Sequence, residues 1–231
     1  MKKSGGYGQF CPVAMAAEVL CTRWTVLVLR EMCAGSTRFN ELRKGVPLMS
    51  PTLLSKRLKE LENYGVIERA RTAEPGVFDY RLTAAGHELK PIVLGMGVWG
   101  QRWLETQSSL KNLDPSLLMW DMRRNLNPTP MPDKRCVVQF VYPELATKQR
   151  YWLVVEHGTV DLCYIDPGYE VDLYVVGDLR AMTAIWMGLT TLRAEVQAGR
   201  LTLTGDATLK RAMQNWLGLS PFAKEKKRVA A

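Results

Sequence analysis

Histidine is scarce in this chain and no two cysteines are closely spaced, so the usual ligands of a metal site are missing. The 231 residues include two histidines, His87 and His157, and five cysteines, at positions 11, 21, 33, 136 and 163. A structural zinc site needs four ligands and commonly uses a Cys-x-x-Cys pair. The sequence therefore predicts no metal and no other cofactor.

The motifs of common enzyme classes are missing too. The chain has no Gly-x-Ser-x-Gly, no phosphate-binding loop and no His-Glu-x-x-His, and neither histidine has an evident nucleophile to activate. We therefore expect that the protein is not an enzyme.

No apolar run approaches the length of about 20 residues that a membrane-spanning helix needs. The chain begins Met1-Lys2-Lys3 and continues with Gly5-Gly6, which lacks the apolar core of a secretory signal. We expect a cytoplasmic protein without membrane insertion.

Positive charge, by contrast, is in excess. Lys and Arg number 31 against 23 Asp and Glu, which gives a formal net charge of +8 and a pI near 9.3. This balance favours an anionic partner, and DNA, RNA or a membrane surface would each satisfy it. The hydrophobic fraction of 47% is ordinary for a globular protein, and the length allows one large domain or two modest ones.

Residues 39–81 follow the order of a winged helix-turn-helix: a short helical pattern, a turn, a longer helical pattern and a hairpin. Gly45 and Pro47 supply the turn between the two helical patterns. The runs 66–69 and 78–81 predict short strands joined across a polar tip. This order indicates a protein that binds double-stranded DNA.

The longer helical pattern, residues 51–64, has two different sides. Ser50 is a good N-cap and Pro51 suits the first helical position. An apolar stripe at helical spacing is predicted to face the core: Leu54, Leu58 and Leu61. The opposite side is small, polar and cationic, as a helix in a duplex groove requires. We predict that Thr52, Ser55 and Lys56 contact base edges. Contacts to the phosphate backbone are predicted for Arg38, Arg69 and Arg71. The predicted DNA-binding set also includes Ser50, Arg57 and Lys59. For any single Lys or Arg, the alternative is a solvated surface charge.

The first 105 or so residues resemble the HxlR family of bacterial transcription regulators, relatives of the MarR group. The residues that carry the resemblance are Cys11-Pro12-Val13, Arg23-Trp24-Thr25, Leu29-Arg30-Glu31, Arg38-Phe39-Asn40-Glu41-Leu42, Ser50, Leu54, Arg57-Leu58, Glu60-Leu61, Gly65, Tyr80, Leu82-Thr83 and Gly86. The resemblance implies a homodimer with one winged domain per subunit that binds a roughly two-fold symmetric operator. Some members of the family repress and others activate, and the sequence leaves the sign of control open.

The cysteines in this part divide into two kinds. Cys21 and Cys33 lie in apolar helical stretches, as small core residues do. Cys11 lies before Pro12 near the start of the chain, and its equivalent in some HxlR-like proteins is an oxidation or electrophile sensor. A thiol-based regulator acting through Cys11 is therefore one alternative function.

Residues 83–105 predict one helix, which Thr83 can cap. Its apolar residues recur at spacings of three and four, and Pro91 with three glycines weakens it as an isolated helix. It is either a core helix within the chain or, together with the helix predicted over 13–20, the two-fold interface of the dimer. We favour the interface, made by Val13, Leu20, Leu89, Ile92, Met96, Trp99 and Trp103.

The composition changes after Trp103, where the polar residues 107–113 predict a linker. A short helix follows, which Asp114 can cap. Strands are then predicted over 136–142, 151–156, 160–165 and 171–176, with consecutive antiparallel pairing as the simplest topology. Helices from Asp178 to Ala198, a last strand over 201–204 and a final helix to about Leu217 complete the pattern.

Residues 112–220 resemble the lipid-binding domain of the sterol-carrier-protein type. The resemblance rests on Trp152-Leu153-Val154-Val155 with Gly158, a helix ending at Gly188, Ala198-Gly199-Arg200-Leu201 and Gly205-Asp206. It implies an apolar tunnel between sheet and helices, for which the candidate lining residues are Phe140, Leu173, Met182, Trp186, Met187, Met213 and Trp216. The alternative for each is an ordinary core residue.

The predicted architecture is α+β: a winged helix-turn-helix domain over 1–106, a linker over 107–113, an antiparallel sheet covered by helices over 114–220, and a basic tail over 221–231. We interpret the tail as a solvated, frayed end. The predicted function is a dimeric DNA-binding transcriptional regulator, controlled by an apolar small molecule in the C-terminal domain. The alternatives are the Cys11 thiol switch and a lipid-binding or carrier protein.

Overall fold

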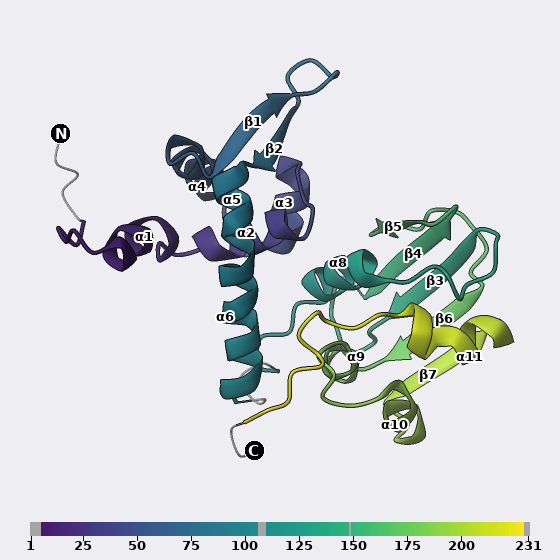
Figure 1. The fold of residues 1–231 in the computed structure, drawn as a ribbon. Helices are drawn as coiled ribbons and strands as arrows, with labels where there is room; N and C mark the ends of the chain where they lie inside the picture. The colour runs from purple at the N-terminus through teal and green to yellow at the C-terminus, as the bar shows by residue number, and fades with distance from the viewer. Residues whose placement is uncertain (1–5, 106–109, 148, 229–231) are drawn as a thin grey trace. The chain divides into compact units, whose positions relative to one another are not determined.

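The computed structural model describes residues 6–105, 110–147 and 149–228 (Figure 1). The chain divides into two compact units, Met1–Gly97 and Val98–Ala231. The division falls inside helix α6 (Lys90–Trp103). The predicted four-part division stays a prediction, and positions 107–109 of its linker lie outside the described residues.

The first unit is a winged helix-turn-helix with two helices before it and further helices after it. Its elements are α1 (Pro12–Leu20), α2 (Thr25–Cys33), α3 (Phe39–Gly45), α4 (Pro51–Asn63), β1 (Ile67–Arg71), β2 (Phe78–Leu82), α5 (Ala84–Glu88) and the start of α6. The two helices, the turn and the hairpin predicted over 39–81 are confirmed.

The inward side of α4 is the centre of the core of this unit. Leu54, Leu58 and Leu61 are at most 1% exposed, and they pack with Val28 and Leu29 of α2. Each fully buried leucine contributes about 1.5–3 kcal/mol relative to an exposed one. The stripe therefore fixes which side of α4 faces solvent.

Gly45 allows α2 and α3 to approach closely. A Cβ at this position would overlap the side chain of Glu31, which is fully buried on α2. Arg30 binds the Glu31 carboxylate at 2.7 Å, and the same guanidinium donates to the Gly45 carbonyl at 2.7 Å. The glycine thus has a packing role in addition to its place before the turn.

Helix α1 lies largely outside this core, since none of its residues is buried. Val13 and Met15 on it are 76% and 58% exposed. Within the described ranges no single helix is long and apolar enough to cross a bilayer, and only α1 and α2 taken as one pair, bent by 83°, meet that length and composition.

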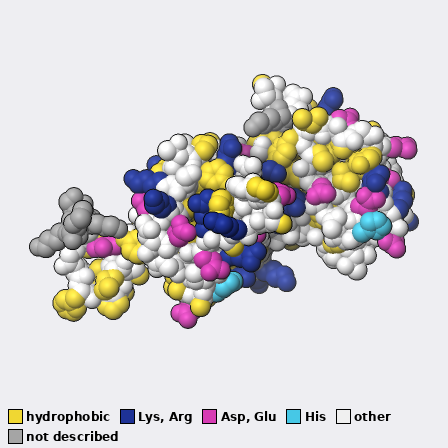
Figure 2. Space-filling model, turned by 90° about the horizontal axis from the view of Figure 1, so that it is seen from above, with side chains coloured by type: hydrophobic (Ala, Val, Ile, Leu, Met, Phe, Trp, Pro, Cys, Tyr) yellow, Lys and Arg dark blue, Asp and Glu magenta, His cyan; other side chains and the backbone are white. Residues whose placement is uncertain are grey.

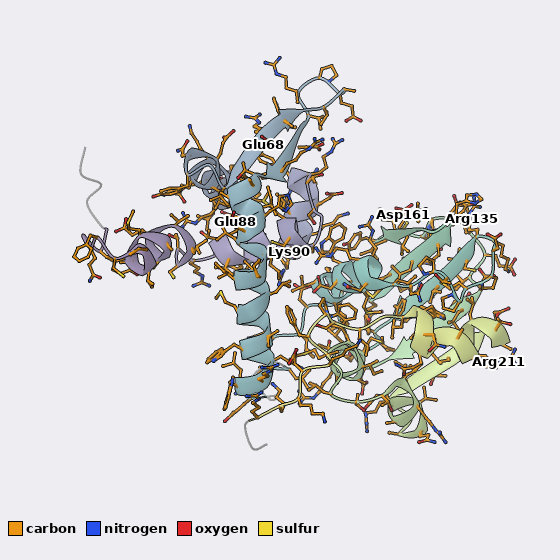
Figure 3. The ribbon with its side chains drawn as sticks, viewed as in Figure 1. Glu68, Glu88, Lys90, Arg135, Asp161 and Arg211 are labelled. Atoms are coloured by element: carbon orange, nitrogen blue, oxygen red, sulfur yellow. The ribbon has the colours of Figure 1, made fainter. Side chains whose placement is uncertain are left out.

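The single helix predicted over 83–105 was wrong, because the chain forms α5 and α6 with a break at Leu89. Thr83 caps α5, accepting from the Gly86 backbone N–H at 3.2 Å. Pro91 has no N–H to donate and its ring clashes with the carbonyl four residues back, which explains the break. Glu88 and Lys90, on either side of it, are labelled in Figure 3.

The second unit is a five-stranded sheet with helices. After the last turns of α6 come α8 (Pro115–Asn125), β3 (Cys136–Val141), β4 (Arg150–Glu156), β5 (Thr159–Cys163), β6 (Leu173–Gly177), α9 (Leu179–Trp186), α10 (Leu192–Gln197), β7 (Leu201–Gly205) and α11 (Ala207–Trp216). The order across the sheet is β5-β4-β3-β6-β7.

The prediction of a purely antiparallel sheet was wrong at β6. This strand pairs in parallel with β3, with Phe140 opposite Val175, while the other neighbours are antiparallel. Asp172 fixes the start of β6 beside β3: its N–H donates to the Val137 carbonyl at 2.9 Å and its carboxylate accepts from the Val137 N–H at 2.8 Å. Residues 164–172 are long enough to cross two strands, so the pairing of β6 with β5 was not required.

The predicted pocket residues lie in the main core of this unit. All except Met187 are at most 6% exposed, and Met187 is partly buried at the margin of the same core. Trp216 is fully buried and its indole N–H donates to the Leu209 carbonyl at 2.8 Å. Whether these side chains line a ligand site stays a prediction.

Candidate nucleic-acid interface

Helix α3 is held at its start by its own acidic residue. The Glu41 carboxylate accepts from the backbone N–H groups of Thr37 and Arg38 at 3.0 and 3.1 Å. These bonds satisfy donors that a helix start otherwise leaves unpaired. They fix the position of the first helix of the pair.

Helix α4 presents a continuous polar side to solvent. Ser50 caps it, with the hydroxyl accepting from the Leu53 N–H at 3.3 Å. The exposed polar residues between Pro51 and Glu60 are Thr52, Ser55, Lys56 and Lys59. Since the leucines on the opposite side are buried, α4 cannot rotate to hide these side chains without exposing its core face. The side chains suited to hydrogen bonding in a groove therefore stand outward on a fixed helix.

The wing is a two-stranded hairpin with a braced tip. Strands β1 and β2 pair antiparallel, with Arg71 opposite Phe78. Thr72 donates from its hydroxyl to the Val77 carbonyl at 3.0 Å, which closes the tip. The Arg69 guanidinium lies 3.5 Å from the centre of the Phe78 ring, and Arg71 is exposed.

Asp79 connects the wing to the start of α3. Its carboxylate pairs with Arg38 Nε at 2.7 Å and with Arg81 at 3.2 Å. The backbone joins the same two parts, because the Tyr80 N–H donates to the Thr37 carbonyl at 2.8 Å. The wing is thus fixed relative to α3, and through the shared core relative to α4.

The structure places most of the predicted DNA-binding residues on an exposed surface. Ser50, Thr52, Ser55, Lys56, Lys59, Arg69 and Arg71 are exposed on α4, its cap and the wing. Figure 2, seen from above relative to Figure 1, shows dark blue Lys and Arg side chains on this face with acidic side chains among them. This surface, from Ser50 to Lys59 with Arg69 and Arg71, is called the α4–wing surface below.

Arg38 and Arg57 differ from the other cationic residues of the set because each is paired with a carboxylate of the protein. Arg38 pairs with Asp79, and Arg57, 12% exposed, binds Glu60 at 2.5 Å and the Arg23 carbonyl at 3.2 Å. Their DNA contacts stay predictions. The sequence analysis did not single out Asp79, since no local pattern distinguishes it from other polar residues of a hairpin.

Comparison with known proteins decides the family. The profile of the HxlR-like helix-turn-helix family matches residues 19–108. An uncharacterized HTH-type transcriptional regulator from Synechocystis sp. is 37% identical over 102 residues, 44% of this chain and 76% of that protein. YvaP of Bacillus subtilis, also named an uncharacterized HTH-type transcriptional regulator, is 36% identical over 99 residues, 42% of this chain and 92% of its own length.

The chain belongs to the HxlR-like helix-turn-helix family of transcriptional regulators. Among solved structures it is similar to the redox regulator HypR in its reduced form, with 34% identity, a TM-score of 0.38 and coverage of 39% of this chain and 91% of that one. Reduced YodB of Bacillus subtilis has 33% identity, a TM-score of 0.36 and coverage of 40% and 93%.

This HxlR-family chain also carries an exposed apolar stripe on α6. Ile92, Met96, Trp99 and Trp103 are between 46% and 59% exposed. Their spacings of four, three and four residues place them along one side of the helix, as in the seam of a coiled coil. Of the other predicted interface residues, Val13 is exposed, whereas Leu20 and Leu89 pack partly against the core of the first unit.

Proposed function

We propose that this HxlR-family chain binds a pseudo-palindromic operator as a homodimer and so regulates transcription. The observation that carries the proposal is the α4–wing surface, whose polar and cationic side chains project from elements fixed by a buried core. Hydroxyl and ammonium groups on the first turns of α4 suit base edges in a major groove. Arg71 and Lys59 suit the phosphates beside it, where exact aim is not required.

Dimerisation follows from the apolar stripe of α6. Four large apolar side chains that are exposed along one side of a helix form a contiguous apolar patch, and such patches often mark protein interfaces. A two-fold dimer through this stripe buries it and presents two copies of α4 to two half-sites about one helical turn of DNA apart.

The direct experiment is selection of bound fragments from genomic DNA, repeated at several salt concentrations. We expect enrichment of an inverted repeat, with affinity that falls steeply as salt rises because phosphate contacts release counterions. If the protein retains all fragments equally at every salt concentration, it is not an operator-specific regulator.

For the second unit we propose control by an apolar small molecule. Support comes from the arrangement of a mixed sheet whose apolar side packs against α8, α9 and α11, with the residues of the predicted sterol-carrier-like tunnel together in that core. Native mass spectrometry of freshly isolated protein is expected to show a bound apolar species. Repeated failure to find or load one with fatty acids would contradict this role.

A thiol switch is the second candidate for control, and the surroundings of Cys11 favour it. The backbone N–H groups of Ala14 and Val13, at the start of α1, hold the pKa of the Cys11 thiol below its ordinary value. Burial instead raises the pKa of the Cys33 thiol. The thiolate is the reactive form, so Cys11 has the larger reactive fraction at a given pH.

We therefore expect iodoacetamide to alkylate Cys11 faster than Cys33 at neutral pH. The pH at which the alkylation rate reaches half of its maximum should be lower for Cys11 than for Cys33. Peptide mass spectrometry over a pH series measures both rates. Cys11→Ser is then expected to abolish any loss of DNA binding on oxidation. Cys21→Ser is the matched control, because Cys21 is exposed and the prediction that it is a core residue was wrong. An oxidant response that persists in Cys11→Ser excludes the switch.

A further inference from the structure

Residues 221–228 of the predicted basic tail are not a solvated, frayed end, contrary to the interpretation from sequence. Within the second unit, which begins at Val98, they bind the last turn of α6 (Figure 1). Glu225 accepts from Arg102 through Nε at 2.7 Å and Nη2 at 2.6 Å. The Arg228 N–H donates to the Arg102 carbonyl at 2.8 Å, and Lys227 Nζ donates to the Leu104 carbonyl at 2.6 Å. The last carbonyls of α6 thus find donors in this segment.

The same segment also contacts the end of α9. The Ser220 N–H donates to the Trp186 carbonyl at 2.9 Å. Ala223 lies directly against Gly188, where a Cβ would be 2.7 Å from the Ala223 carbonyl oxygen. On the α6 side, the Gln101 side-chain amide donates to the Met187 carbonyl at 3.3 Å. The end of α9 is therefore bound to both the segment and the last turn of α6.

Helix α9 in turn is part of the core of the second unit. Leu179, Met182 and Ile185 are at most 2% exposed and belong to the main cluster. Side chains that pack against one another transmit displacement from one element to the next. A change in that core that moves α9 must also move the groups that hold residues 220–228.

We propose that residues 220–228 are a strap that couples the core of the second unit to the last turn of α6. In the state seen in the structure, the strap is bound to the last turn of α6 at Arg102, Trp103 and Leu104. When α9 shifts, the strap dissociates from these residues. The Arg228 guanidinium lies 5.8 Å from the centre of the Trp103 ring, so release changes the surroundings of a residue in the exposed apolar stripe. The consequence for dimer strength and DNA binding rests on the function proposed above.

The contacts of the strap are of a strength that permits release. Arg102 and Glu225 are 33% and 27% exposed, so solvent screens their ion pair. The remaining contacts are single hydrogen bonds, each of modest net strength. Segments held in this way open locally without global unfolding.

The first test breaks and restores the ion pair in the full chain. Glu225→Arg is expected to increase amide exchange of residues 98–104 by about two- to fivefold, measured by mass spectrometry. The exchanged pair, Arg102→Glu with Glu225→Arg, is expected to restore the wild-type rate. Lys226→Ala, at an exposed neighbouring position, is the control and leaves the rate unchanged.

The second test displaces the strap without changing charge. Gly188→Ala places a methyl group against Ala223. Gly199→Ala is the control, because φ is +71° at Gly199 and +72° at Gly188, so both substitutions strain the backbone equally. Nothing lies within 4 Å of a Cβ at Gly199, so this variant adds no contact. Only Gly188→Ala is expected to speed exchange in residues 98–104. Unchanged exchange in both Glu225→Arg and Gly188→Ala overturns the strap.

Sedimentation velocity on the same variants tests the coupling to dimerisation separately. We expect the dissociation constant of the dimer to rise in parallel with the exchange rate. If amide exchange of residues 98–104 is faster but the dissociation constant of the dimer is unchanged, the strap is not coupled to dimerisation. The proposal that residues 220–228 bind the last turn of α6 is then still supported. A wild-type chain that is monomeric at all concentrations refutes the proposed dimer, and the exchange data still decide whether the strap exists.

Discussion

Replacing Thr52, Ser55 and Lys56 together by alanine is expected to remove the preference of the protein for its operator over random duplex. All three are exposed on the first two turns of α4, the part of a recognition helix that reaches base edges. Each good base contact contributes about 1–3 kcal/mol of discrimination, so the triple variant should lose about 100-fold or more in specific affinity. Fluorescence anisotropy with a selected operator and a scrambled duplex measures the effect.

The matched control is Glu62→Ala with Asn63→Ala, which are exposed on the last turn of the same helix. This variant tests whether any truncation on α4 weakens binding, and it should retain operator preference. Circular dichroism should show both variants folded, since none of the five side chains belongs to the core. Full operator preference in the triple variant would remove α4 as the reading element.

The second large effect is expected on assembly. Met96→Glu with Trp99→Glu should convert the dimer to a monomer, because two carboxylates would have to enter an apolar interface. The two side chains are 54% and 59% exposed in the single chain, so the monomer itself should remain folded. Light scattering after size-exclusion chromatography measures the mass directly.

Leu94→Glu is the control for this pair. Leu94 is 37% exposed and lies on the opposite side of α6, about 200° around the helix from Ile92 at 100° per residue. It should leave the dimer intact. A Met96→Glu, Trp99→Glu variant with wild-type mass would place the interface elsewhere on the chain.

The two predictions are linked through DNA binding. A monomer retains the α4–wing surface but reaches only one half-site, so its affinity for the full operator should fall while its contacts to a single half-site persist. The α4 variant should show the reverse, a normal dimer without operator preference. The two variants together therefore separate recognition from assembly.

Local patterns predicted the helix-turn-helix because each of its signals lies within a few residues. The Ser50 cap and the leucine spacing of α4 act over one or two helical turns, and the structure has both. Gly45, which was predicted to lie in the turn, is instead the last residue of α3. The same spacing fixed which side of α4 is exposed. Most of the α4–wing surface could therefore be listed before the fold was known.

Contacts distant in sequence were not predictable in this way. The positive charge of Arg38 is typical of a phosphate contact. In the structure, however, Arg38 pairs with Asp79, which lies on strand β2 of the wing. The tail has the composition of a solvated end, yet Glu225 within it matches Arg102, 123 positions earlier. In both cases the sequence shows the charged residue, but it does not show which distant residue pairs with it.

By itself, the sequence determined the winged helix-turn-helix, the outward side of α4 and the strands of the second half, because hydrophobic periodicity and capping are properties of neighbouring residues. Only the tertiary structure decided the parallel place of β6 beside β3, the ion pairs that engage Arg38 and Arg57, and the binding of residues 220–228 to α6. These contacts join residues that are distant in the sequence. Which of those residues come together is decided by the packing of the whole core and not by any local pattern.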